Sequence, residues 1–180
     1  MSRSEHICLM ANYNEWMNAK VYAAAAKLPS EALLAHRKAY FGSILGTLNH
    51  LAVADTIWLK RFATHPANYP ALDPVRCGPD LTHLEDFLFP DVHSLAGYRK
   101  ALDAVIVAWA QTIAEPELDH VLHYANTKGV AASRNFHGLV THFFNHQTHH
   151  RGQITTLLSQ AGTDVGVTDL LALVADEAVI

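Results

Sequence analysis

Four long segments with helical periodicity, separated by prolines and turn residues, constrain the fold of this chain more than any other feature. They cover about residues 5–27, 43–63, 94–114 and 133–161. The second carries an apolar stripe at steps of three and four residues, formed by Ile44, Leu48, Leu51, Trp58 and Phe62. Ser94 is the predicted N-cap of the third segment, and Gly162 is a typical C-terminal stop for the fourth. The pattern predicts four amphipathic helices.

The segments between these helices have distinct compositions. Residues 64–93 contain five prolines, so they cannot form one regular helix. Within residues 118–132, Val121, Leu122 and Tyr124 precede the turn sequence Asn126-Thr-Lys-Gly129 and Val130 follows it, which predicts a short β-hairpin. Residues 168–175 are predicted to form a short helix. Four helices with one long crossover predict an all-α fold, an antiparallel four-helix bundle in a single domain of residues 1–180.

The composition excludes several classes of protein. Hydrophobic residues make up 50% of the chain, the net charge is −4 and no basic run occurs, so a nucleic-acid partner is not expected. No stretch approaches the ~18 consecutive apolar residues of a membrane span, and the N-terminus becomes polar too early for a secretory signal. The two cysteines, Cys8 and Cys77, are isolated, which favours a reduced, cytoplasmic compartment.

Histidines concentrate in the fourth predicted helix. Four of the 13 fall within nine residues, at His142, His146, His149 and His150. At about 100° per residue, His150 lies roughly 30° and His146 roughly 70° from the centre of the apolar face. His142 and His149 lie roughly 110° and 130° away by the same arithmetic. We therefore expect His146 and His150 to face the interior or its edge, where residues four apart can share one ion.

The spacing alone leaves two interpretations open. A metal site and a pair of hydrogen-bonded core histidines have about equal support, although burying two imidazoles without partners costs ~1–3 kcal/mol each. The segment superficially matches the H-E-x-x-H pattern, but Gln147 stands at the glutamate position. A neutral amide cannot act as general base, which argues against a zincin-type protease.

A third ligand is expected from another helix, and His50 is the best candidate. Small residues on its helix face, Gly46, Thr47 and Ala54, would allow close approach of a neighbouring helix. His50 nevertheless lies far from the apolar stripe of its own helix, so a surface histidine is an equal alternative. Asp55 falls inside that stripe. We expect it to be buried with a hydrogen-bond partner, and orientation of a ligand histidine is one candidate role.

Three stretches together resemble the DinB family over nearly the whole length: Tyr13–Asn18, Gly42–Trp58 and Asn145–Gln153. The resemblance implies an antiparallel four-helix bundle, usually dimeric, with a divalent ion of zinc or nickel type held by three histidines. Some relatives are transferases or isomerases that depend on bacillithiol, mycothiol or glutathione, and many have no known activity.

Carried over position by position, the metal ligands implied by the resemblance are His50, His146 and His150. Three neutral imidazoles leave a divalent ion with its full charge and open positions, and such an ion lowers the pKa of a bound water or thiol. The first hypothesis is a thiol S-transferase in which a thiolate attacks a small-molecule electrophile in the mouth of the bundle. The second is a non-catalytic, metal-binding stress-response protein whose ion fastens two helices. A cleft leading to the metal and an exchangeable water on it would distinguish the two.

The sequence also suggests which residues line the mouth of the bundle, whether a nucleophile is present and whether the chain forms a dimer. Tyr13, Trp16 and Arg151 are candidates to line the mouth, with core packing an equal alternative for Trp16. No protein nucleophile is identified, and Cys8 is expected to be a buried small hydrophobe. The first helix is apolar around much of its circumference, which predicts a homodimer, although packing within one chain would absorb the same residues.

Overall fold

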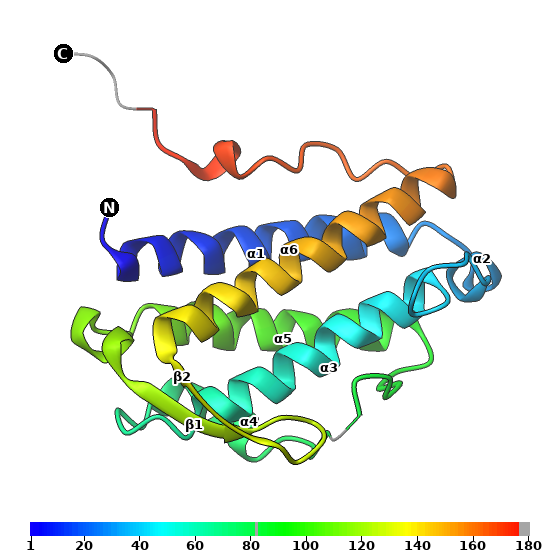
Figure 1. The fold of residues 1–180 in the computed structure, drawn as a ribbon. Coiled ribbons are helices and arrows are strands. Elements are labelled where there is room, and N and C mark those ends of the chain that lie inside the picture. Colours follow the sequence, from blue (N-terminus) through cyan, green and yellow to red (C-terminus); the bar gives the residue numbers. More distant parts are fainter. Residues whose placement is uncertain (82, 177–180) are drawn as a thin grey trace.

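The computed structural model describes residues 1–81 and 83–176, and it is mostly helical with one small antiparallel sheet. The four long helices are α1 (Arg3–Ala25), α3 (Ile44–Phe62), α5 (Val92–Ala110) and α6 (Phe136–Gln160). Figure 1 shows α1 and α6 running in one direction and α3 and α5 in the other. Both α1 and α3 pack against α5 and against α6. The four helices predicted from periodicity are confirmed, and no described helix is long and apolar enough to cross a membrane.

The shorter elements complete the connections. They are α2 (Ser30–Leu34), η1 (Pro70–Leu72), α4 (Asp73–Arg76), η2 (Glu115–Asp119), β1 (Val121–Ala125), β2 (Ala131–Asn135) and η3 (Leu170–Leu173). The predicted hairpin is confirmed: β1 and β2 pair with Val121 opposite Asn135. The turn uses Asn126, whose side-chain oxygen accepts from the Lys128 and Val130 amides, and Gly129 at φ +75°. The tail forms a 3-10 turn, shorter than the helix predicted there.

Two predicted helix starts are wrong. The N-cap of α5 is Asp91, whose carboxylate accepts from the amide of Ser94, so the helix begins at Val92. The final helix begins at Phe136, capped by Asn135, because Ser133 belongs to β2 and pairs with His123. At the start of α5, Asp91 and Ser94 can both act as caps, and the backbone geometry that selects Asp91 is not visible in the sequence.

Two apolar clusters fill the interior, one toward each end of the long helices. Phe62, Trp109, Phe136 and Phe143 are fully buried in the cluster nearest the hairpin. The other cluster contains the first two turns of α3 and the last turns of α1 and α6. Between them, near the middle of the long helices, lies a layer of buried polar side chains, here called the polar layer: Asn14, Asn18, Asp55, Arg99, Asp103, Gln147 and Arg151.

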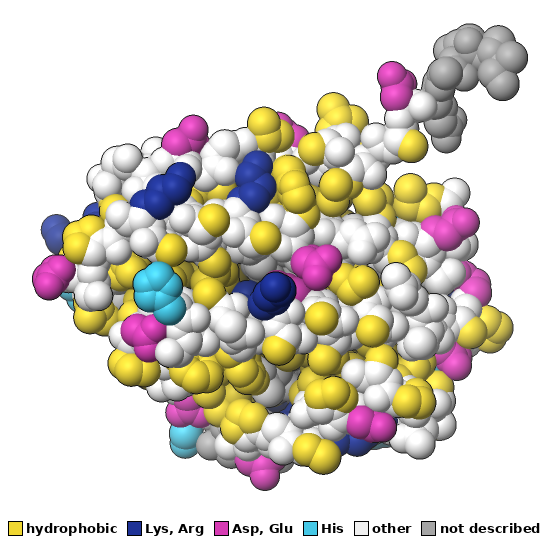
Figure 2. Space-filling model, turned by 180° about the vertical axis from the view of Figure 1, so that it is seen from behind, with side chains coloured by type: hydrophobic (Ala, Val, Ile, Leu, Met, Phe, Trp, Pro, Cys, Tyr) yellow, Lys and Arg dark blue, Asp and Glu magenta, His cyan; other side chains and the backbone are white. Residues whose placement is uncertain are grey.

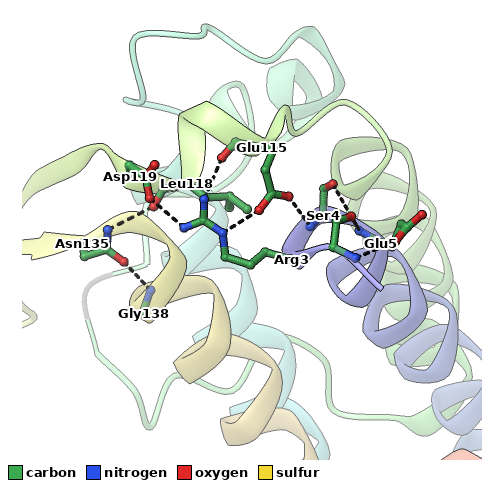
Figure 3. Close-up of polar contacts among 9 residues, drawn as sticks. Arg3, Ser4, Glu5, Glu115, Leu118, Asp119, Asn135 and Gly138 are labelled. Atoms are coloured by element: carbon green, nitrogen blue, oxygen red, sulfur yellow. Dashed lines mark hydrogen bonds and ion pairs between the residues drawn. The ribbon is translucent and has the colours of Figure 1, made fainter.

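Polar contacts tie the start of α1 to the segment that precedes the hairpin (Figure 3). The Arg3 guanidinium pairs with Glu115 at 2.6 Å and with Asp119 at 2.7 Å. Asn135 donates to the Leu118 carbonyl and accepts from the Gly138 amide, which fixes the start of α6. The ion pairs are substantially exposed, so their main effect is to position these ends and their contribution to stability is small.

The apolar circumference of α1 is largely absorbed within the chain. Tyr13, Met17, Val21 and Tyr22 are buried, and Trp16 is half-buried with Lys20 over its ring. The view from behind, in Figure 2, shows a surface where hydrophobic side chains lie among scattered single charges. Packing within the chain thus accounts for most of the residues that suggested a dimer.

Candidate metal centre

The structure brings three histidines from two helices into one group. His50 extends from α3, and His146 and His150 extend from successive turns of α6. One ring nitrogen from each lies within 4.8 Å of the others, and the Nε2 atoms of His50 and His146 are 3.4 Å apart. His50 is only 3% exposed and His150 8% exposed, while His146 is half-buried. This is the set of residues that the sequence nominated.

Hydrogen bonds fix how two of the rings present their nitrogens. His50 Nδ1 lies 2.9 Å from the Leu84 carbonyl oxygen, and His150 Nδ1 lies 2.8 Å from Gln153 Oε1. A carbonyl oxygen can only accept, so each ring donates from Nδ1 and keeps an unprotonated Nε2 as its free ligand atom. Such a partner on the second nitrogen is the usual support of a metal-ligating histidine.

The electrostatics of the group favour neutral imidazoles. Burial lowers the pKa of His50 to about 4, against the opposing effect of its bond to the Leu84 carbonyl. Burial and the neighbouring histidines lower the pKa of His146 to about 3, and burial also lowers the pKa of His150. The Nε2 lone pairs of His50 and His150 lie within 4.8 Å of a ring nitrogen of His146, so a cation placed among the three rings could be bound by all of them. The donor set therefore fits a divalent ion of the zinc type.

One side of the histidine group is covered and another is open. The Phe41 ring stacks on His50 at 3.7 Å between centroids and meets His150 edge-on at 5.6 Å. A cavity of about 320 Å³ reaches His50; it is bounded mainly by residues 40–41 and by residues 84–87. The Phe41 ring thus shields one side of the group, while the cavity borders His50 and His146 is half-buried.

Gly46 allows the Phe41 segment to lie this close to α3. A Cβ atom at Gly46 would stand 2.2 Å from the Phe41 carbonyl oxygen. The small residue therefore makes room for a loop backbone, whereas the sequence suggested close approach of a helix. His50 is buried by the same loop and by Leu84, so the structure excludes the surface histidine that was one of the two alternatives left open.

The two histidines predicted to face away from the interior, His142 and His149, do so. His142 and His149 are both exposed. The His142 ring meets Trp58 edge-on at 5.2 Å, and His149 Nε2 lies 3.1 Å from the Gln153 amide nitrogen. Neither joins the group of three ligand atoms.

The residues expected at the mouth lie elsewhere. The Arg151 guanidinium lies over the Tyr13 ring at 5.3 Å and donates to Asn14, while the Tyr13 hydroxyl donates to the Thr168 carbonyl. Neither residue, nor Trp16, lines the cavity at His50, so that expectation is wrong. Arg151 follows His150 by one position, which turns its side chain about 100° around α6, toward α1.

Asp55 is buried, as predicted, but its partners are not the histidines. It is 1% exposed, and its Oδ2 accepts from Arg99 at 2.5 Å and from Gln147 at 2.9 Å. Arg99 also pairs with Asp103 at 2.8 Å, and Asp103 accepts from Asn14 and Asn18. The orienting role considered for Asp55 is therefore wrong: the residue joins α3 to α5 and α6.

Burial dominates the ionisation of the polar layer. It raises the pKa of Asp103 to about 6 and also raises that of Asp55, although Arg99 opposes both shifts. Cys8 is half-buried with its thiol 3.4 Å from the Ala110 carbonyl, and burial raises its pKa. A thiol with a raised pKa is a poor nucleophile, in agreement with the structural role expected for Cys8.

Reasoning from the sequence did not identify three groups that contact the candidate ligand histidines: Phe41, the Leu84 carbonyl and Gln153. Gln153 follows His150 by three residues on one helix, a spacing that places the two side chains in contact and was a usable signal. The Leu84 carbonyl and the Phe41 ring come from loops, where no periodicity reports position.

The fold and this group define a mostly helical protein with a candidate three-histidine metal centre between two antiparallel helices. The model of the DinB family matches residues 1–177, and the chain belongs to this family. It is 25% identical over 157 residues to "Protein DinB" of Bacillus subtilis (strain 168), with 87% of each chain covered. No solved structure is a significant match to this sequence.

Proposed function

We propose that this chain is a divalent-metal-dependent enzyme that transfers a low-molecular-weight thiol to a small electrophile. The observation that carries the proposal is the group of three neutral imidazoles together with a cavity that borders one of them, His50. An ion of zinc or nickel type bound there would supply the Lewis acidity that lowers the pKa of a coordinated thiol. The ligands are assigned to His50, His146 and His150.

The chain's own residues supply binding and orientation. Leu84 and Gln153 hold two imidazoles in the tautomer that ligates, and the Phe41 ring keeps water from one side of them. In the proposed reaction the thiol loses its proton to solvent, and its sulfur then bonds to the electrophilic carbon as the leaving group departs with its electron pair. No side chain of the protein becomes covalently attached.

The same proposal covers the arrangement of the helices, the oligomeric state and the cellular location. We take the four long helices as an up-down-down-up bundle in which α3 and α6 carry the site, on the strength of the helix contacts and directions (Figure 1). A homodimer, which the family resemblance implies, is part of the same proposal. The two free cysteines, Cys8 and Cys77, favour a cytoplasmic location.

The alternative is a non-catalytic, metal-binding stress-response protein. The ligands come from two different helices, so an ion would fasten α3 to α6 and stabilise the fold. The cavity at His50 favours the enzyme, because a purely structural ion gains nothing from access to solvent.

A measurement of metal content tests whether the three histidines bind an ion at all. Elemental analysis of untagged protein is expected to give about one equivalent per chain, and to lose it in His50→Ala, His146→Ala and His150→Ala. His142→Ala and His149→Ala are matched controls on the same helix and are expected to keep the ion. Retention by His50→Ala, or equal loss in all five variants, would contradict the site.

Turnover separates the enzyme from the structural alternative. The loaded protein is incubated with bacillithiol, mycothiol or glutathione and a chromogenic aryl halide, and thioether formation is followed by absorbance. The enzyme hypothesis expects turnover that disappears in His146→Ala. A protein that binds one ion, catalyses no transfer with any of the three thiols and unfolds more easily after chelation supports the alternative.

A further inference from the structure

A second and larger cavity lies beside α3, the start of α6 and the hairpin, and it shares no lining residue with the cavity at His50. Its volume is about 650 Å³, and its walls include Trp58, Tyr124, Ser133, Arg134, Leu139 and His142. His142 precedes His146 by one helical turn, and their ring centroids are 6.0 Å apart. On α3, Trp58 lies about two turns beyond His50. Tyr124 belongs to β1 and Ser133 and Arg134 belong to β2, so this cavity borders the hairpin.

The walls of this cavity are flat and aromatic. The Trp58 ring lies 5.5 Å from the Tyr124 ring and 5.2 Å from the His142 ring, measured between centroids. Leu139 is buried beneath them. At these separations the rings pack on one another, and together they form one aromatic wall of the cavity against which a planar guest can lie.

The two cavities differ in charge. Arg134 lines the aromatic cavity, and the Arg61 guanidinium lies 4.6 Å above the Trp58 ring and 5.1 Å above the Tyr124 ring. Among the described residues, no carboxylate lines this cavity. The cavity at His50 is lined instead by Glu85 and Asp86, with no lysine or arginine from the described chain. The aromatic side therefore favours an anion, and the other side disfavours it.

We propose that the cavity between Trp58, Tyr124 and His142 binds a planar aromatic carboxylate, which is the non-reacting part of the electrophilic substrate. Arg134 pairs with the carboxylate at the rim, and the ring lies against Trp58. The thiol then enters from the side of His50, so the two substrates reach the histidines from two different cavities. This inference rests on the proposed function for its role in catalysis, and on the cavity alone for binding.

Calorimetric titration of the full chain with benzoate tests the binding. Benzamide and benzylamine are the neutral and cationic probes of matched shape. Metal-free and zinc-loaded protein are titrated separately, because a carboxylate can also ligate an ion. Benzoate is expected to bind both forms, with benzamide about fivefold weaker and benzylamine weaker still.

Variants assign the binding to this cavity. R134Q is expected to weaken benzoate about fivefold, and K128Q, which removes a cation from the hairpin turn outside the cavity, is expected to leave it unchanged. Trp58→Leu is expected to weaken benzoate about tenfold. His142→Leu provides a second probe of the same wall, because Trp58 also packs on Phe62 and its replacement can disturb folding.

The outcomes are distinct from those of the metal assay. Equal affinity for benzoate and benzamide, or equal effects of R134Q and K128Q, would overturn the anion assignment. Binding seen only with zinc and abolished by His146→Ala would place the carboxylate on the ion and overturn the cavity. Benzoate bound by metal-free protein with the expected variant pattern supports the cavity even if the chain binds no metal.

Discussion

Replacing Asp55 with alanine should destabilise the fold more than most single substitutions. Asp55 is 1% exposed and accepts two charge-assisted hydrogen bonds, from Arg99 and Gln147. Removing it leaves the Gln147 amide without that acceptor and takes one of the two carboxylates away from buried Arg99. Breaking a buried ion pair in this way costs about 3–5 kcal/mol, a large fraction of a typical unfolding free energy of about 5–15 kcal/mol.

Urea denaturation followed by far-UV circular dichroism measures this loss in the metal-free protein. Asp80 provides the matched control: it pairs with Lys60, but its side chain is 93% exposed, so Asp80→Ala should leave the midpoint unchanged. A double-mutant cycle with Arg99→Met should show a coupling of about 1–3 kcal/mol. A loss below about 1 kcal/mol for Asp55→Ala, or strict additivity with Arg99→Met, would refute the view that the polar layer acts as a unit.

Three further outcomes are expected. Burial keeps the three imidazoles neutral, with the pKa of His50 at about 4, so protons compete with the metal only in acid. Zinc affinity should therefore be nearly constant from about pH 7.5 to 6 and fall toward pH 4. A steep loss of zinc affinity above about pH 6 would contradict this. Gln153→Ala should lower zinc affinity at least tenfold by releasing the His150 ring, whereas Gln153→Glu keeps an acceptor and should bind normally, as competition with a chromogenic chelator would show. Gly46→Ala should displace the Phe41 loop, because the new Cβ would overlap a backbone oxygen; increased proteolysis after Phe41 would reveal it, and an unchanged cleavage pattern would argue against the close approach.

The helices and two of the three histidines of the candidate site followed from local periodicity. The apolar stripe of α6 determines which way its side chains face, so the inward position of His146 and His150 and the exposure of His142 and His149 were predictable. His50 was not predictable in this way. Its burial comes from Phe41, in the loop before its helix, and from Leu84, 34 residues after His50 in the sequence. The sequence offered His50 as the best candidate beside an equal alternative, and the resemblance to a family supplied the missing argument.

The polar layer shows a second limit of reasoning from one sequence. Asp55 was conspicuous as an acid within an apolar stripe, and its burial could be predicted. Its partner Arg99 lies 44 residues away on α5, and Gln147 lies 92 residues away on α6. A helical pattern shows that a buried acid needs a partner, but which residue becomes that partner depends on how the helices pack. The orienting role considered for Asp55 failed for that reason.

On α6, the candidate ligand histidines and the residues of the polar layer are neighbours in the sequence, so a movement of the helix would displace both sets. Gln147 follows His146 and Arg151 follows His150, so each member of the polar layer on this helix stands one position after a candidate ligand. A helix that slides by one turn moves every side chain by about 5.4 Å, which would separate the histidines of α6 from His50 as well as Gln147 from Asp55. If α6 moves as a rigid body, Asp55→Ala must therefore weaken zinc binding, and zinc must restore part of the lost stability in proportion to its binding free energy. Equal zinc affinity in Asp55→Ala and the unaltered protein would mean that the histidines are positioned by the Phe41 and Leu84 contacts alone.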